Sequence, residues 1–172
     1  TSAGFAWAIG KLDQQVSRDE LVAHVTDLCA ATDLPLNVDS ERCYPDDSGG
    51  VAETVSLLAE AGAAGFSIED YDPGAGRIED VVVAAERVAV AAEAAHGLSE
   101  PLVLTARAEN HIHGVDDFDD TLARLVAYRD ANFLGLADIA ADYELSEDAV
   151  RAALIYYRRH RCAINGRIAQ NE

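Results

Sequence analysis

The segment Gly65-Phe-Ser-Ile-Glu-Asp70 has the composition of a buried strand that ends in two carboxylates. Two other segments share this form: Leu34-Pro-Leu-Asn-Val-Asp39 ends in an acid, and Pro101-Leu-Val-Leu-Thr-Ala-Arg107 ends in a base. Stretches with helical spacing of apolar residues lie between them. This strand–loop–helix order predicts an α/β fold of parallel strands with right-handed crossovers. The C-terminal ends of such strands meet at one edge, where active sites form in barrels and in open sheets alike.

Helical patterns fill the intervals between the predicted strands. A Ser-x-x-Glu capping box at Ser17–Glu20 predicts the start of one helix. Further helices are expected from about Val51, over about 78–96 and over 118–131. The intervening residues 71–77, rich in proline and glycine, are predicted to form a loop.

Charge and cysteine usage exclude several classes of protein. The 172-residue chain has a net charge of -18, which argues against nucleic acid and anionic membranes as partners. An anionic substrate would need a cation or an arginine to offset this field. Neither a run of about 18 apolar residues nor a secretory leader is visible. Cys29, Cys43 and Cys162 form no CxxC pair, so neither a disulfide framework nor a zinc site is indicated, and a cytoplasmic location is expected.

The charge also divides the chain. Residues 1–132 hold 8 lysines and arginines against 25 aspartates and glutamates, whereas residues 133–172 hold 5 against 6. No strand pattern occurs after residue 132; two helical patterns are present, the second capped by Ser146 and ending in the basic run Arg158–Arg161. We therefore predict one domain over 1–132 and a helical C-terminal module over 133–172.

Five motifs in the first domain point to a family. Val38-Asp-Ser-Glu-Arg-Cys-Tyr44 is similar to an Asp-x-Asp-x-Gly-Tyr segment, and Ile68-Glu-Asp70 and Thr105-Ala-Arg107 match the strand ends that follow it. Upstream, Thr1–Ala6 is similar to a Ser-x-Gly turn, and Gly10-Lys-Leu-Asp13 to the Gly-x-x-Asp after it. In this order the motifs resemble those of the phosphoenolpyruvate mutase/isocitrate lyase superfamily over about residues 1–131. The resemblance implies a partial (β/α) TIM barrel with a helical C-terminal hairpin.

The resemblance also implies a metal site. Mg²⁺ (or Mn²⁺) would lie near Asp39, with Glu41 and Glu69 reaching it directly or through water. The chemistry of the cation agrees, because Mg²⁺ prefers carboxylate oxygens and keeps several waters. The three acids could equally be ordinary solvated carboxylates in a chain that has 31 of them.

The substrate site implied by the resemblance uses other residues. Arg107 would pair with a substrate carboxylate or phosphoryl group, a task that suits its planar fork, or it could be a salt-bridge partner on an acidic face. Ser2, Ala3 and Gly4 would supply hydrogen bonds to the substrate. Asp13 and Arg107 would be the catalytic polar residues. The implied activity is Mg²⁺-dependent carbon–carbon or carbon–phosphorus cleavage or rearrangement of a small α-keto or 2-hydroxy carboxylic acid.

Three features depart from the family pattern. Isocitrate lyases carry a loop with cysteine and histidine after the Ile-Glu-Asp strand, and Tyr71–Arg77 contains neither. Cys43 stands at the position of a family glycine and is not interpreted as a nucleophile. The family barrel should begin before Thr1 and continue with more strands after residue 131, so we expect an incomplete barrel and leave its activity open.

The C-terminal module has a resemblance of its own. Ile139 to His160 is similar to a small helical domain of some bacterial antitoxins. The alternative function is therefore a non-catalytic, oligomerising or antitoxin-like module with an acidic scaffold. Under either hypothesis we expect a homo-oligomer, because a sheet of few strands leaves edges that must be covered.

Overall fold

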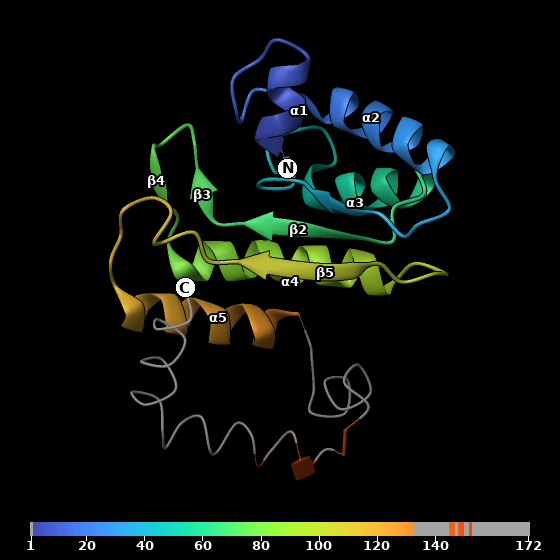
Figure 1. Ribbon diagram of the computed structural model, residues 1–172. Helices are drawn as coiled ribbons and strands as arrows, with labels where there is room; N and C mark the ends of the chain where they lie inside the picture. The colour runs from blue at the N-terminus through green and yellow to red at the C-terminus, as the bar shows by residue number, and fades with distance from the viewer. Residues whose placement is uncertain (1, 133–144, 147, 150–151, 153–172) are drawn as a thin grey trace. The chain divides into compact units, whose positions relative to one another are not determined.

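The computed structural model describes residues 2–132, 145–146, 148–149 and 152 (Figure 1). The chain divides into two units, Thr1–Phe133 and Leu134–Glu172, and the fold described below is that of the first. In the second, Ala149 N donates to Ser146 Oγ at 3.2 Å, the contact expected of a cap at Ser146. The antitoxin-like resemblance falls otherwise outside the described residues and stays a prediction.

A parallel sheet forms the centre of the first unit. Within the described residues it has three strands, β1 (Asn37–Asp39), β2 (Gly65–Glu69) and β5 (Val103–Arg107), in the order β1-β2-β5. The pairing places Asp39 beside Ser67 and Glu69 beside Arg107. The predicted α/β class and its strands are thus confirmed. β1 and β5 are the outer strands of this sheet. The homo-oligomer was expected because such outer strands need to be covered, and it stays a prediction.

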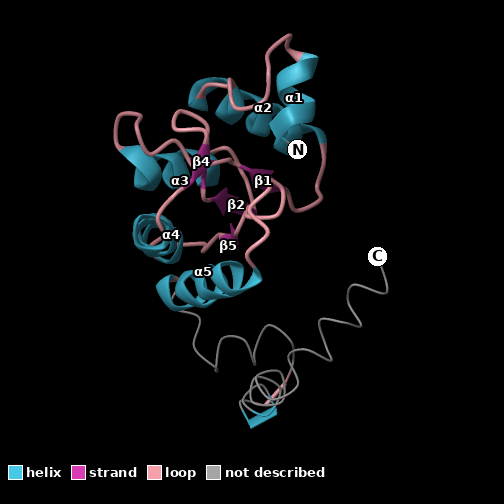
Figure 2. Cartoon of the chain, turned by 90° about the vertical axis from the view of Figure 1, so that its left-hand side faces the viewer, coloured by secondary structure: helices cyan, strands magenta, loops and turns pink. Residues whose placement is uncertain are grey.

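Helices cover the sheet along an arc. They are α1 (Ser2–Ala8), α2 (Arg18–Ala31), α3 (Gly50–Glu60), α4 (Val81–His96) and α5 (Phe118–Ala131). Figure 2 shows α2, α3, α4 and α5 following one another around the three strands, as the outer helices of a barrel would. The capping box that begins α2 is present as predicted, and α5 has the predicted bounds. No helix among the described residues is long and apolar enough to cross a membrane.

The core lies on both faces of β2. All five residues of β2 are buried, and Phe66 and Ile68 belong to the same buried core cluster as Val55 and Leu58 of α3. Burial on both faces is typical of a parallel sheet between layers. Gly65 allows β2 and β5 to approach closely, because a Cβ there would lie 2.7 Å from the Val103 carbonyl oxygen.

Two predictions of local structure were wrong. The expected loop at 71–77 is a small antiparallel hairpin of β3 (Tyr71–Asp72) and β4 (Arg77–Ile78). Each strand has two residues, too few for an alternating pattern to show in the sequence. The expected Ser-x-Gly turn near Thr1–Ala6 is part of helix α1, so its amides follow helical geometry.

Candidate active site

The C-terminal ends of β1, β2 and β5 bring Asp39, Glu69 and Arg107 together, as the motif order predicted. Arg107 Nη2 forms a short ion pair with Glu69 Oε2 and lies 3.6 Å from Asp39 Oδ1. Arg107 Nε lies 3.0 Å from Glu109 Oε1. With Glu41 these residues form what we call the strand-end cluster: Asp39, Glu41, Glu69, Arg107 and Glu109. Four carboxylates and one guanidinium give it a formal charge of about -3.

The loop after β1 places Glu41 in this cluster. Glu41 has a φ of 51°, and its carbonyl oxygen accepts a hydrogen bond from Glu69 N at 2.9 Å. Cys43 and Tyr44 also adopt positive φ, at 62° and 49°. Such left-handed residues each cost roughly 1–2 kcal/mol, so the surrounding contacts must hold the loop. The family motif has glycine where Cys43 stands, which a positive φ explains.

Cys43 itself is a packing residue. Its side chain is fully buried, and this burial raises the pKa of its thiol to about 12. The thiolate is therefore scarce at neutral pH, in agreement with the interpretation that Cys43 is not a nucleophile.

The electrostatics of the strand-end cluster are unbalanced. Burial, and then the charges of Glu69, Asp13 and Asp39, raise the pKa of Glu41 to about 7. Among the described residues, Asp39 Oδ1 and Glu41 Oε1 are buried and accept no hydrogen bond. Burial lowers the pKa of Arg107, but the neighbouring carboxylates outweigh it and raise that pKa above its usual range. The cluster thus has more negative than positive charge, and two of its buried carboxylate oxygens accept no hydrogen bond.

Two contacts of the cluster were missed by sequence reasoning. Gln14 Nε2 donates to Glu69 Oε1 at 2.9 Å, and Glu109 approaches Arg107 as described above. Gln14 follows Asp13 directly and has a φ of 63°. No sequence pattern predicts this left-handed conformation. Glu109 stands where the family strand end has aspartate, so its acidic character was the available signal.

The predicted substrate residues lie beside the predicted metal residues. Ser2 N donates to Asp39 Oδ2 at 3.2 Å, and Ser2 Oγ donates to Asp13 Oδ1 at 3.3 Å. Ala3 and Gly4 follow Ser2 in the first turn of α1. All the residues that the motifs singled out are therefore near β1 or β2, but their roles toward a ligand stay predictions.

The donor set suits a hydrated cation better than a closed metal site. No group of three or more histidine, cysteine, aspartate or glutamate residues in the described part of the chain has the arrangement to hold a metal. The cluster offers instead two carboxylate oxygens that accept no hydrogen bond and an excess of negative charge. Mg²⁺ commonly takes one or two carboxylates and keeps waters as its other ligands, so these residues fit it.

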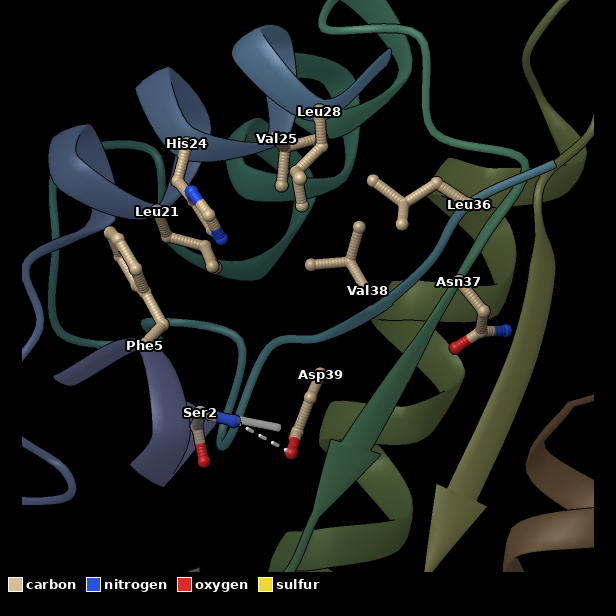
Figure 3. Close-up of a pocket in the computed structure, with 10 residues that line it drawn as sticks. All are labelled: Ser2, Phe5, Leu21, His24, Val25, Leu28, Leu36, Asn37, Val38 and Asp39. Carbon is tan, nitrogen blue, oxygen red and sulfur yellow. Dashed lines mark hydrogen bonds between the residues drawn. The ribbon is translucent and has the colours of Figure 1, made fainter. Parts of the chain in front are cut away.

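Two pockets flank the cluster. One, of about 230 Å³, is lined by polar side chains such as Gln14, Glu41 and Arg42 and by apolar ones such as Val16 and Pro45. The other, of about 120 Å³, runs between α1, α2 and β1 (Figure 3). In Figure 3 Ser2 and Asp39 close one end of it, and apolar side chains such as Val25 and Leu36 line the rest. The first pocket shares Glu41 with the strand-end cluster, and the second shares Asp39.

The phosphoenolpyruvate phosphomutase family matches residues 1–140 of the chain. The protein belongs to this family. The match confirms the resemblance drawn from the five motifs, and it extends past the predicted boundary at residue 132. Members of the superfamily have the TIM-barrel fold, which the parallel sheet and its arc of helices reproduce in part.

Solved structures agree with this assignment. A candidate lyase/mutase from Burkholderia cenocepacia J2315 is 45% identical, with a TM-score of 0.71, over 82% of this chain and 54% of that one. A candidate phosphonomutase from the same organism is 33% identical, with a TM-score of 0.71, over 81% and 62%. A phosphonopyruvate hydrolase complexed with oxalate and Mg²⁺ shares the fold at 18% identity and a TM-score of 0.66, over 95% and 73%. The chain therefore spans little more than half the length of the first two relatives. No curated protein matches it.

Proposed function

We propose that the protein works as a Mg²⁺- or Mn²⁺-dependent enzyme that cleaves or rearranges a carbon–carbon or carbon–phosphorus bond in a small α-keto or 2-hydroxy acid. The observation that carries this proposal is the convergence of Asp39, Glu69 and Arg107 at the C-terminal edge of the sheet. The excess negative charge of the cluster, in which two carboxylate oxygens accept no hydrogen bond, supports it, because a bound dication would neutralise that charge.

Each residue of the site then has a role. Asp39 would bind the cation, with Glu41 and Glu69 acting directly or through water. The cation would supply stabilisation of enolate-like charge on the substrate. Arg107 would bind the substrate carboxylate or phosphoryl group through its two-pronged guanidinium.

The remaining residues position these groups. Gln14 holds one oxygen of Glu69, which leaves the other for Arg107. Asp13 accepts a hydrogen bond from the Ser2 hydroxyl and so orients the start of α1, where Ser2, Ala3 and Gly4 would donate to the substrate. The substrate anion must compete with the cluster carboxylates for Arg107, and a bound cation would ease that competition.

Calorimetry tests the proposal directly. Mg²⁺ is titrated into the wild type, Asp39→Ala and the control Asp33→Ala, which removes the same charge from an exposed position. We expect Asp39→Ala to weaken Mg²⁺ binding at least about tenfold and Asp33→Ala to leave it unchanged. Oxalate is then added as a probe, and it should bind only to the Mg²⁺-loaded wild type and control. Equal binding of Mg²⁺ by all three proteins, or binding by none, would reject the site.

A further inference from the structure

Asp70 follows Glu69 directly, yet its carboxylate belongs to a different set of contacts. The side chain is 1% exposed. Its Oδ1 accepts a hydrogen bond from Glu109 N at 2.9 Å. Its Oδ2 accepts a short hydrogen bond from Tyr128 Oη and a second one from Arg124 Nη1 at 3.3 Å. Three donors therefore satisfy a buried carboxylate that lies one residue from the strand-end cluster.

Helix α5 fixes this carboxylate in place. Arg124 also donates to the Glu79 carbonyl oxygen at 2.7 Å and, through Nε, to Asp120 at 2.6 Å. Burial and the charge of Asp70 raise the pKa of Tyr128, so its hydroxyl stays protonated and donates. The rotamer of Asp70 is thus determined by two side chains of one rigid helix.

The contacts continue from Asp70 to the candidate site. Glu109 N is held by Asp70, and Glu109 Oε1 lies 3.0 Å from Arg107 Nε. One residue separates Glu109 from Arg107 in the chain. The end of β5 therefore cannot shift without breaking the hydrogen bond to Asp70.

We infer that Asp70, held by Tyr128 and Arg124, is a positioning residue that acts through Glu109 to orient the guanidinium of Arg107. The inference deepens the proposed function, on which it rests only for the identity of the ligand that Arg107 meets. It makes α5 part of the site's support, through Arg124 and Tyr128.

The test follows the Arg107 side chain itself. In the full chain labelled with ¹⁵N, and without metal or substrate, the exchange of the Arg107 Nε proton with water is measured by NMR. Tyr128→Phe removes one donor to Asp70, and Asp70→Asn removes its charge. Glu109→Gln changes the direct partner of Arg107. Val55→Ala is the control, because it opens a fully buried position of α3 and removes no hydrogen-bonding or charged group.

We expect Tyr128→Phe and Asp70→Asn to speed this exchange about threefold or more, because a weaker set of hydrogen bonds to Asp70 loosens the ion pair between Glu109 and Arg107 Nε. Val55→Ala should lower stability and leave the exchange unchanged. A purely structural role for Asp70 predicts the opposite pattern, with no change in either network variant while Glu109→Gln accelerates exchange, and that result would overturn the inference. If Asp70→Asn does not fold, Tyr128→Phe decides, since Asp70 keeps its bonds to Glu109 and Arg124.

A second readout ties the inference to the ligand. With Mg²⁺ present, Tyr128→Phe should weaken oxalate binding while Val55→Ala does not. If the wild type binds neither Mg²⁺ nor oxalate, the proposed function fails, and the exchange measurement still decides the role of Asp70.

Discussion

Glu69 and Asp70 are neighbours in the chain but belong to two ionic groups of opposite character. Glu69 is in the strand-end cluster, with its excess of negative charge. Asp70 is in a second group, which we call the helix-side network: Asp70, Glu79, Arg87, Arg124 and Tyr128. Its two carboxylates and two guanidiniums balance. Each of its carboxylate oxygens accepts a hydrogen bond, whereas Asp39 Oδ1 and Glu41 Oε1 in the cluster accept none.

This difference suits the helix-side network to support the site and the strand-end cluster to bind a ligand. A buried network that is neutral and whose carboxylate oxygens are all hydrogen-bonded can accept a cation only by breaking existing bonds. A cluster of like charges, in which two carboxylate oxygens accept no hydrogen bond, becomes more stable when it binds a cation or a proton. The raised pKa of Glu41 reflects this. The two groups meet at Glu69, whose carbonyl oxygen accepts a hydrogen bond from Arg87 Nη2 at 3.0 Å. The strained and charged cluster therefore adjoins a network whose carboxylate oxygens are all hydrogen-bonded.

Breaking the helix-side network should have the largest effect. Arg124→Met leaves the buried Asp70 and the partly exposed Asp120 without their guanidinium partner. We expect the free energy of unfolding to fall by about 3 kcal/mol, as measured by urea denaturation. Arg107→Met in the cluster should lower it by about 1 kcal/mol or less, because its side chain is 35% exposed. Equal losses in the two variants would contradict the distinction between the groups.

Removing a charge from the cluster should stabilise the protein. In metal-free buffer at pH 8 we expect Glu41→Gln to raise the free energy of unfolding by about 1 kcal/mol, since it relieves repulsion from Glu69 and Asp39. Glu79→Gln in the network should lower it, because Glu79 bonds to Arg42 and Arg87. Urea denaturation measures both variants. An excess of Mg²⁺ should reduce the difference in the free energy of unfolding between Glu41→Gln and the wild type. A lower free energy of unfolding in Glu41→Gln would contradict the prediction that the Glu41 charge destabilises the protein.

The smallest effect is expected outside both groups, at Glu20 on the surface. The Lys11 hydrogen bond, followed by those from Ser17, lowers the pKa of Glu20 from 4.5 to about 2. A lowered pKa in the folded state stabilises the protein above pH 4.5, and this stabilisation is lost as the pH falls toward 2. NMR titration of the Glu20 carboxyl should show the low midpoint, which rises toward 4.5 in Lys11→Met. A midpoint that does not move in this variant would assign the shift to the cap alone.

Local sequence patterns predicted much of the fold and part of the site. The strand ends at Asp39, Glu69 and Arg107 follow apolar runs, and the start of α2 follows from its capping box, because these signals span only a few residues. The contacts that support the site join distant positions. Tyr128 and Asp70 are 58 residues apart, and Gln14 and Glu69 are 55 apart. No periodicity relates such pairs, so the helix-side network could not be inferred before the structure.

The loop that carries Glu41 has a consequence for kinetics. Cys43 lies within it, fully buried, with a thiol pKa of about 12. A thiol reagent can reach its sulfur only when the loop opens, and Cys29, partly exposed in α2, offers a reference for ordinary accessibility. The rate of Cys43 modification, followed by mass spectrometry, would thus depend on how often the loop opens. The modification rate of Cys43 therefore reports how often the loop that carries Glu41 opens.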